Sequence, residues 1–267
     1  MQNLGNFMDN KGYAVFLDID STLLWKGTVP EINIKTIDKV RKAGHYVFIN
    51  TARSYGFIPQ SLLDEVPLDG VVAGIGTDLR LCGKQIESHT MKKESLKQIA
   101  EYFMGTHREV GFEGEDTVLW INPSPERHKK HLIEQPPALL HSPEEFDTVY
   151  KDEKISKMYI RGHLTPEEYE LFGKENIMYQ HEVYAEFVPK GFGKAVGMLK
   201  MLKYIDIPTE RCIAMGDSGN DEDMLKAAGI SVAMGNATAE IKSIADFIST
   251  DAKDGGVAYA LEKIILT

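Results

Sequence analysis

The chain alternates short, continuous apolar runs with stretches in which apolar residues recur every three or four positions. Near its two ends the apolar runs, each expected to form a strand, are Ala14–Leu17, Tyr46–Ile49, Val71–Ala73, Cys212–Met215, Ile230–Met234 and Phe247–Ile248. The stretches with helical spacing are Glu31–Ala43, Gly193–Tyr204, Asp221–Ala228, Ala239–Ala245 and Val257–Ile265. This alternation predicts a parallel sheet covered by helices on both faces.

The middle of the chain has a different pattern. A helix is expected over Lys92–Met104, and strand-like runs occupy Val118–Ile121, Lys157–Ile160 and Asn176–Tyr179. The segment Asn122–Ser142 is rich in Pro and His and is expected to be a long loop.

These patterns together predict an α/β fold with an insertion. Residues 1–82 and 185–267 are expected to form a doubly wound, parallel-sheet core. Residues 83–184 are expected to form an α+β cap domain inserted into that core. The aromatic and charged cap residues able to face a ligand are Trp120, Tyr159, Arg161, His163 and Tyr184, and the sequence does not say which of them do.

Composition narrows the class of protein. The 267 residues carry a formal net charge of −10, which argues against nucleic acid or an anionic membrane as a partner. Cys82 and Cys212 are far apart and suggest no disulfide framework, so a reducing cytoplasm is expected. Met1–Lys11 does not resemble a secretory signal, and no apolar run approaches the roughly 20 residues that span a bilayer.

Polar residues follow three of the predicted strands directly. They are the segments Asp18–Thr22, Asn50–Arg53 and Gly216–Asp221. Each one alone is typical of a turn or a helix cap. Ligands of open parallel sheets bind beyond the carboxyl ends of the strands, so the three together predict one polar crevice.

Four carboxylates would share this crevice: Asp18, Asp20, Asp217 and Asp221. They would repel one another unless a cation lay among them. A hard divalent cation with oxygen ligands, Mg²⁺ above all, satisfies this requirement.

The same residues fit phosphoryl transfer, which needs an in-line nucleophile and positive charge around the phosphoryl oxygens. Asp18 is the candidate nucleophile, and Asp20 is placed to act as general acid and base. Thr51 offers a hydroxyl to a phosphoryl oxygen. Lys194 opens a helix and offers an ammonium group, so this lysine and the cation supply the positive charge that the acidic composition lacks.

The residues resemble the haloacid dehalogenase superfamily of phosphatases, and its Cof-type branch in particular. The resemblance covers Val15 to about Gly76 and Val183 to the C-terminus. It is strongest in Gly216–Asp221 and in the trio Asp18, Asp20 and Thr22. It implies a HAD-like, Rossmannoid core and an inserted cap. The segments Gly235–Ala237 and Asp254–Val257 also resemble the tail of the Cof-type branch.

The resemblance also implies roles for single residues. Asp18 would be nucleophile and metal ligand, Asp20 would be acid/base and would bind the metal through its backbone carbonyl, and Asp217 would be a metal ligand. The residues implied to bind the phosphoryl group are Thr51 and Lys194. Asn220 and Asp221 would support Lys194 and the surroundings of the metal, and Asn220 is also expected among the residues that bind substrate.

The chain departs from the family pattern at three positions. Ser21 and Ala52 stand where the family usually has Gly, and because both are small we expect the local geometry to be kept. Ile75 precedes Gly76 where the family often has Asn, so a substrate contact made by that Asn would be lost.

Three features remain open to two interpretations. Arg53 could bind substrate or form a structural ion pair. Lys190 could be a second cation facing the phosphate or a surface lysine. His128 and His131 have the spacing of a metal pair on a helix, but a solvated loop fits them better because no third ligand lies nearby.

The function expected from the sequence is Mg²⁺-dependent hydrolysis of small phosphate monoesters, such as sugar phosphates or similar metabolites, through an aspartyl-phosphate intermediate. One alternative is a phosphomutase or phosphotransferase with the same intermediate. Another is a non-catalytic signalling module with Asp18 as phospho-acceptor, although Asp20 would shorten the life of its acyl phosphate. The sequence leaves the oligomeric state open.

Overall fold

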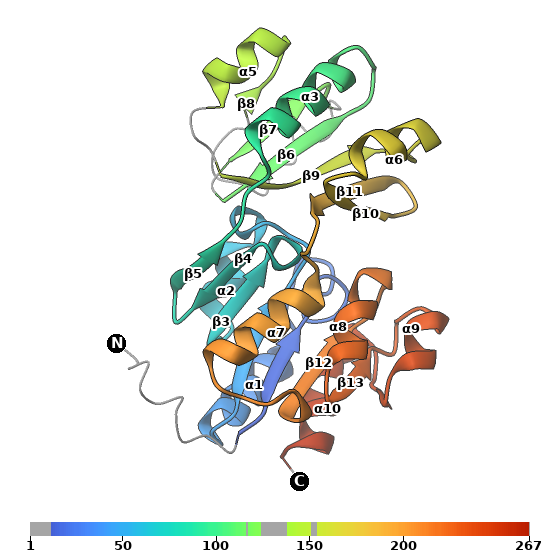
Figure 1. The fold of residues 1–267 in the computed structure, drawn as a ribbon. Helices are drawn as coiled ribbons and strands as arrows, with labels where there is room; N and C mark the ends of the chain where they lie inside the picture. The colour runs from blue at the N-terminus through green and yellow to red at the C-terminus, as the bar shows by residue number, and fades with distance from the viewer. Residues whose placement is uncertain (1–11, 116, 124–137, 151–153, 267) are drawn as a thin grey trace. The chain divides into compact units, whose positions relative to one another are not determined.

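The computed structural model describes residues 12–115, 117–123, 138–150 and 154–266 (Figure 1). The chain divides into two compact units. The first runs up to Ala52 and also contains Gln60–Glu87 and the chain from Gly193 onward. The second contains Arg53–Pro59 and Ser88–Phe192.

The first unit is built on an eight-stranded sheet within the described residues, in the order β14-β13-β12-β1-β2-β3-β4-β5. The strands are β1 (Ala14–Leu17), β2 (Tyr46–Asn50), β3 (Gly70–Ala73), β4 (Asp78–Leu81), β5 (Lys84–Ser88), β12 (Cys212–Gly216), β13 (Ile230–Ala233) and β14 (Phe247–Ile248). The strands from β14 to β3 are parallel, as predicted. β4 is antiparallel to β3, because the short turn Gly74–Gly76 leaves no room for a crossover helix.

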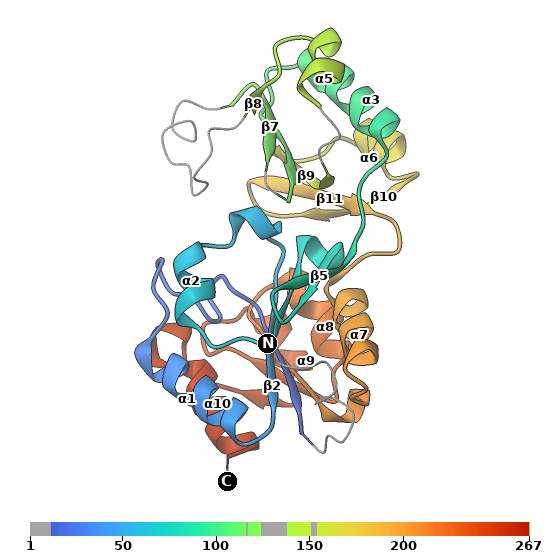
Figure 2. The same cartoon turned by 90° about the vertical axis from the view of Figure 1, so that its left-hand side faces the viewer.

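Helices cover both faces of this sheet. They are α1 (Glu31–Lys42), α2 (Gln60–Glu65), α7 (Lys194–Tyr204), α8 (Glu222–Ala227), α9 (Ala239–Ile244) and α10 (Gly256–Ile264). α1 and α10 pack together on one face, and α7 and α8 pack together on the other (Figure 2). The predicted doubly wound core is confirmed.

The packing of α7 does not simply follow its apolar residues. The buried face carries Met198, Met201 and Leu202, whereas Val196 and Leu199 are only half-buried. The helix approaches the turn after β3 so closely that a Cβ at Gly197 would lie 2.7 Å from the Cα of Gly76. Two facing glycines therefore allow the first turn of α7 to lie against the sheet.

The second unit is built on a six-stranded, mainly antiparallel sheet in the order β10-β11-β9-β6-β7-β8, again within the described residues. The strands are β6 (Val110–Gly114), β7 (Val118–Ile121), β8 (Ala138–Leu139), β9 (Ile155–Arg161), β10 (Asn176–Gln180) and β11 (Tyr184–Pro189). The helices α3 (Lys93–Met104), α5 (Pro143–Val149) and α6 (Pro166–Phe172) lie on one face (Figure 1). The apolar cluster beneath them includes Phe103, Phe112, Phe146, Phe172 and Phe187.

The second unit extends beyond the range expected for the cap. β11 pairs with both β9 and β10, so the chain stays in this sheet past residue 184 and the unit ends at Phe192. The loop Arg53–Pro59 also joins it, and Ser54 Oγ donates a hydrogen bond to Glu113 Oε2 at 3.2 Å. Of the loop expected over Asn122–Ser142, residues 124–137 lie outside the described residues, and β8 occupies part of the remainder.

Within the parts of the chain that the structure describes, no helix has the length and apolar composition needed to cross a membrane.

Candidate active site

The tips of three neighbouring strands bring the candidate site together. In the sheet, Leu17 of β1 lies beside Ile49 of β2 and Met215 of β12. Asp18, Thr51 and Asp217 follow these strands within two residues, so they emerge at one edge of the sheet. Parallel pairing thus unites segments that are up to two hundred residues apart in sequence.

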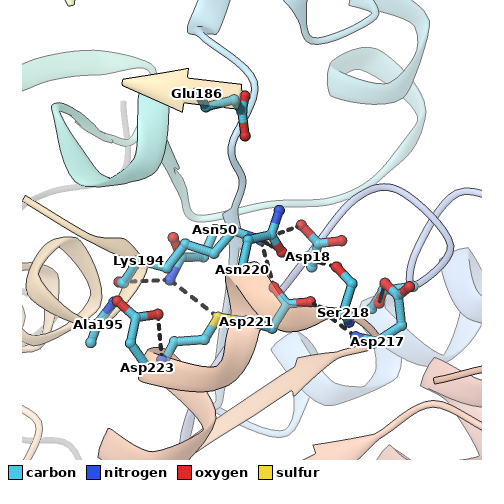
Figure 3. A network of polar contacts seen from close by, with 12 residues as sticks. Asp18, Asn50, Glu186, Lys194, Ala195, Asp217, Ser218, Asn220, Asp221 and Asp223 are labelled. Carbon is cyan, nitrogen blue, oxygen red and sulfur yellow. Dashed lines mark hydrogen bonds and ion pairs between the residues drawn. The ribbon is translucent and has the colours of Figure 1, made fainter. Parts of the chain in front are cut away.

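Lys194 lies at the centre of the polar network (Figure 3). Its Nζ donates to Asp18 Oδ1 at 2.6 Å and to Asp221 Oδ1 at 2.5 Å, and it lies 3.4 Å from Asn220 Oδ1. The Lys194 side chain is fully buried. Asn50 Nδ2 donates to the Lys194 backbone carbonyl at 3.0 Å and helps to hold the start of α7.

The charges of this network depend on one another. Burial alone would lower the pKa of Lys194, but the carboxylates of Asp18 and Asp221 raise it above its ordinary value, so the ammonium stays charged. Burial raises the pKa of Asp18 well above its usual range, and Lys194 acts against that shift. A carboxylate in this position therefore depends on nearby positive charge to remain ionised.

Three carboxylates could hold a metal ion. Oxygen atoms of Asp18, Asp217 and Asp221 lie within 4.8 Å of one another. Burial, reinforced by the charge of Asp221, raises the pKa of Asp217 to about 7, while the Thr22 hydroxyl, which donates to it at 3.0 Å, acts in the opposite direction. An all-oxygen donor set with one lysine for three carboxylates fits a hard divalent cation.

This carboxylate group contains three of the four carboxylates expected to share the crevice. The expected ligands were Asp18, Asp217 and the backbone carbonyl of Asp20, with Asp221 in a supporting role. Asp221 lies within the group, whereas the carboxylate of Asp20 is not part of it, among the described residues, and its side chain is exposed.

Asp221 also fixes the loop after β12. Its Oδ2 accepts hydrogen bonds from the backbone N–H groups of Asp217 at 3.0 Å and Ser218 at 3.1 Å, while Oδ1 binds Lys194. Ser218 Oγ donates to Asn220 Oδ1 at 3.0 Å. A Cβ at position 216 would lie 2.5 Å from the Asp221 side chain, so the loop needs Gly216. These contacts explain why the Gly216–Asp221 segment has its particular residue types.

The turn after β1 keeps the geometry that a glycine would adopt. Ser21 has φ 62°, in the left-handed region, and its N–H donates to the Leu24 carbonyl at 2.9 Å. Ile75 shares this conformation, with φ 57° and ψ 42°, although it is β-branched and buried. Such a conformation is uncommon for Ser and costly for Ile.

The other predicted site residues have these places. Thr51 is buried, and its backbone bonds to Val72 and to Ile75. Arg53 belongs to the second unit, where its Nη1 donates to the Phe57 carbonyl at 3.0 Å. Lys190 is exposed. His128 and His131 lie outside the described residues.

The five cap residues named from the sequence as able to face a ligand belong to the second unit. The Trp120 and Tyr159 rings pack edge to face, with centroids 6.3 Å apart, and the Tyr159 hydroxyl donates to Glu109 at 3.2 Å. The backbone carbonyls of Arg161 and His163 accept from the Arg108 guanidinium. The Tyr184 ring stacks on His181.

Sequence reasoning missed two supporting residues. Asp223 Oδ2 accepts from the Ala195 N–H at 3.1 Å and thereby holds the first turn of α7. Asn50 is fully buried at the end of an apolar strand, and its partners lie in α7 and α8. The signal for Asn50 was an amide that closes an apolar run, and the signal for Asp223 was a further acidic residue just past Asp221.

Comparison with known proteins agrees with this geometry. Residues 15–261 match the family model of haloacid dehalogenase-like hydrolases. The chain is 27% identical over 260 residues to YkrA of Bacillus subtilis (strain 168), covering 96% of this chain and 98% of YkrA. It is also 27% identical over 280 residues to the 5-amino-6-(5-phospho-D-ribitylamino)uracil phosphatase YitU of the same organism, covering 96% and 98%.

A solved structure shows the same fold. The phosphatase BT1666 of Bacteroides thetaiotaomicron superposes with a TM-score of 0.79 at 26% identity, over 98% of this chain and 97% of that one. The resemblance seen in the sequence is confirmed, including the Cof-type branch. The chain therefore belongs to the haloacid dehalogenase-like hydrolases, and it is a phosphatase that acts on small phosphorylated substrates.

Proposed function

We propose that the protein hydrolyses small phosphate monoesters, such as sugar phosphates or similar metabolites, in a Mg²⁺-dependent reaction that proceeds through an aspartyl-phosphate on Asp18. The observation that carries this proposal is the arrangement of Asp18, Lys194 and the neighbouring carboxylates at the sheet edge. A nucleophilic carboxylate held against a buried ammonium suits attack on an anionic phosphoryl group.

The first step forms the covalent intermediate. An oxygen of the Asp18 carboxylate attacks phosphorus, the bond between phosphorus and the ester oxygen breaks, and Asp20 gives its proton to the departing oxygen. In the second step a water attacks the aspartyl-phosphate, Asp20 takes a proton from that water, and phosphate leaves as the Asp18 carboxylate is restored.

The remaining residues bind and orient the phosphoryl group. Lys194 supports its negative charge, and the Thr51 hydroxyl donates to one of its oxygens. Asp221 and Asn220 hold the Lys194 ammonium in place. Asp18 and Asp217, together with the backbone carbonyl of Asp20, would hold Mg²⁺, with Asp221 close by. When bound, Mg²⁺ supplies positive charge that offsets the carboxylates and the phosphoryl oxygens.

The substrate range is proposed from similarity to a relative. The match to YitU covers 96% of this chain and 98% of YitU, whose name gives a ribityl phosphate as substrate, so a phosphorylated polyol of this type belongs among the candidates. We further propose that residues of the second unit, such as Trp120 and Arg161, select among such esters, and that the enzyme acts in the cytoplasm.

A screen for phosphate release tests this proposal. Purified protein is incubated with phosphorylated sugars and polyols and with p-nitrophenyl phosphate, with Mg²⁺ or with chelator. We expect release of inorganic phosphate that requires Mg²⁺ and is lost in Asp18→Asn, while circular dichroism shows that the variant stays folded. Retained activity in Asp18→Asn would contradict a covalent mechanism through Asp18. Transfer of phosphate to a sugar hydroxyl, with little free phosphate, would instead favour the phosphotransferase alternative.

A further inference from the structure

Asn236 lies in the loop after β13, in the Gly235–Ala237 motif that the proposed mechanism does not use. Its side chain bonds to two segments that are far apart in the sequence. Nδ2 donates to the backbone carbonyl of Ser21 at 2.8 Å, and Oδ1 accepts from the backbone N–H of Ala252 at 2.7 Å. The Ser21 carbonyl can only accept a hydrogen bond and the Ala252 N–H can only donate one, so the two contacts use both the Nδ2 and the Oδ1 of Asn236.

The loop around Asn236 is itself firmly held. The Thr238 N–H donates to the backbone carbonyl of Asp217 at 3.1 Å, and the Gly235 N–H donates to the carbonyl of Thr250 at 2.9 Å. A Cβ at Gly235 would lie 2.6 Å from the backbone nitrogen of Asp251, so this close approach requires glycine. Asn236 therefore extends from a fixed support toward the turn after β1.

The turn that Asn236 reaches carries Asp20. Ser21 follows Asp20 directly and occupies the left-handed region with φ 62°, a conformation that costs free energy for residues other than glycine. Because serine stands here in place of glycine, which adopts this conformation without that cost, the hydrogen bonds within and around the turn must hold it. They include the bond from the Ser21 N–H to Leu24 and the bond from Asn236 to the Ser21 carbonyl. The Asp20 side chain is exposed, so packing does little to orient it.

We infer that Asn236 is a positioning residue for the general acid and base: its hydrogen bond to the Ser21 carbonyl holds the turn that aims Asp20 at the ester oxygen. This inference rests on the proposed function, in which Asp20 transfers the proton. Asn236 touches neither substrate nor the reacting atoms, and it acts only through the turn.

Alkyl and aryl phosphate esters depend to different degrees on the proton that Asp20 donates. When an alkyl phosphate is cleaved, the departing oxygen is strongly basic and needs the proton of Asp20 as its bond to phosphorus breaks. The p-nitrophenolate oxygen is weakly basic and leaves without that proton. The value of kcat/KM reports formation of the aspartyl-phosphate, so a misplaced Asp20 should lower kcat/KM for alkyl esters more than for the aryl ester.

The experiment compares kcat/KM for an alkyl phosphate with that for p-nitrophenyl phosphate in Asn236→Ala and Asn236→Asp. The aspartate variant keeps an acceptor for the Ala252 N–H but has no donor for the Ser21 carbonyl. General acid catalysis contributes about 10²- to 10⁴-fold, so partial misplacement should lower the alkyl-to-aryl ratio about tenfold or more in both variants. A ratio within one variant is independent of the fraction of folded enzyme.

A matched control is available in α1. Asn33 Oδ1 accepts from the Ala258 N–H at 2.9 Å, which is a comparable bond to the C-terminal segment, but Asn33 is not bonded to the Ser21 turn in the structure described. We expect Asn33→Ala to lower thermal stability and to leave the ratio unchanged. Asp20→Asn should lower the ratio at least as much as either Asn236 variant.

The outcomes distinguish failure of the inference about Asn236 from failure of the proposed function. If Asp20→Asn lowers the ratio and the Asn236 variants do not, the inference is overturned and the proposed function stands. A fall in Asn236→Ala without a fall in Asn236→Asp would also overturn it, because the Ser21 bond would then be irrelevant. If Asp20→Asn leaves the ratio unchanged, the role of Asp20 in the proposed function is wrong, and the inference fails with it.

Discussion

At the scale of single residues, the site carries more negative charge than the protein can balance by itself. Lys194 pairs with Asp18 and Asp221, while Asp217 has only the Thr22 hydroxyl as a side-chain donor among the bonds described. Burial, reinforced by the charge of Asp221, raises the pKa of Asp217 to about 7. A metal must displace the proton that this carboxyl holds at low pH.

The first prediction follows from that competition. Below about pH 7 the metal-free Asp217 is mostly protonated, so Mg²⁺ affinity should fall as pH falls, up to about tenfold per pH unit for one displaced proton. Above that pH the carboxyl is already ionised and affinity should level off. Titration calorimetry in buffers of different ionisation enthalpy counts the released protons. The control Asp223→Asn, at a carboxylate that bonds to the Ala195 N–H outside the expected ligand set, should keep the pH dependence. Asp217→Asn should weaken it and leave the part due to Asp18, whose pKa burial also raises. A flat affinity from pH 6 to pH 9 would contradict this.

The second prediction concerns Ile75, whose left-handed backbone opposes its side chain. Glycine adopts this conformation without the steric cost of a Cβ, so Ile75→Gly should be more stable than Ile75→Ala by about 1–2 kcal/mol. Ile37 is equally well buried but lies in α1, where glycine is worse than alanine by about 1 kcal/mol. Urea unfolding of the four variants should therefore give opposite signs at the two positions. The same sign at both would show that the Ile75 conformation carries no strain.

At the scale of elements, periodicity predicted those whose packing is regular. Strands such as β1 and β12 are continuous apolar runs because helices cover both faces of the sheet. The charged strand β4 (Asp78–Leu81) and the short helix α2 (Gln60–Glu65) were not predicted, since polar and apolar residues alternate over only four positions in β4 and α2 has only six residues. In α7 the glycine at position 197, and not a large apolar residue, lies close to the turn after β3, so apolar spacing alone does not define the buried face of this helix.

The loop Arg53–Pro59 belongs to a different unit from the segments that flank it in the sequence. It follows β2, yet its contacts place it in the second unit, where the buried Ser54 binds Glu113. Burial raises the pKa of Glu113, and Lys157, which forms an ion pair with it, acts against that shift. Nothing in the spacing of residues 53–59 indicated this partner, because Glu113 lies on a strand that had not been predicted.

The third prediction tests that attachment. Ser54→Ala should increase amide hydrogen exchange in Arg53–Pro59 and lower stability by about 1 kcal/mol, the usual contribution of one hydrogen bond. Ser95→Ala is the matched control, because Ser95 Oγ donates to Glu175 at 2.7 Å in an exposed setting. Exchange in β1 should not change in either variant. Unchanged exchange in the 53–59 loop of Ser54→Ala would mean that this bond does not hold the loop.

At the scale of the whole molecule, the sequence predicted the doubly wound core and the grouping of strand tips. It could do so because parallel strands end at the same edge, so the polar residues after β1, β2 and β12 had to meet. It placed Asp221 in that crevice with Asp18 and Asp217, but it could not predict that the Asp221 carboxylate accepts from the backbone N–H groups of Asp217 and Ser218, since this depends on the tight turn at Gly216. Although the chain is acidic as a whole, Lys194 supplies positive charge within the site, where it is buried against two carboxylates.

The fourth prediction concerns whether Ca²⁺ can replace Mg²⁺ at the site. Ca²⁺ accepts about 6–8 oxygens, whereas Mg²⁺ requires about six in a strict octahedron. Ca²⁺ can therefore take both oxygens of Asp18 and occupy the nucleophile. We expect Ca²⁺ to support little activity and to inhibit in competition with Mg²⁺, as measured by Mg²⁺ titrations at fixed Ca²⁺ concentrations. Full activity with Ca²⁺ alone would show that Asp18 is not both ligand and nucleophile.

The central claim is that the phosphoryl group passes through Asp18, and trapping it there is the most direct test. Enzyme is mixed with p-nitrophenyl phosphate and Mg²⁺, quenched in acid within milliseconds to seconds, and its peptides are analysed by mass spectrometry. The account predicts a phosphate adduct on Asp18 that disappears with time in the wild type and persists longer in Asp20→Asn, which lacks the base for its hydrolysis. Turnover at the normal rate with no adduct on Asp18, or an adduct on another residue, would contradict it.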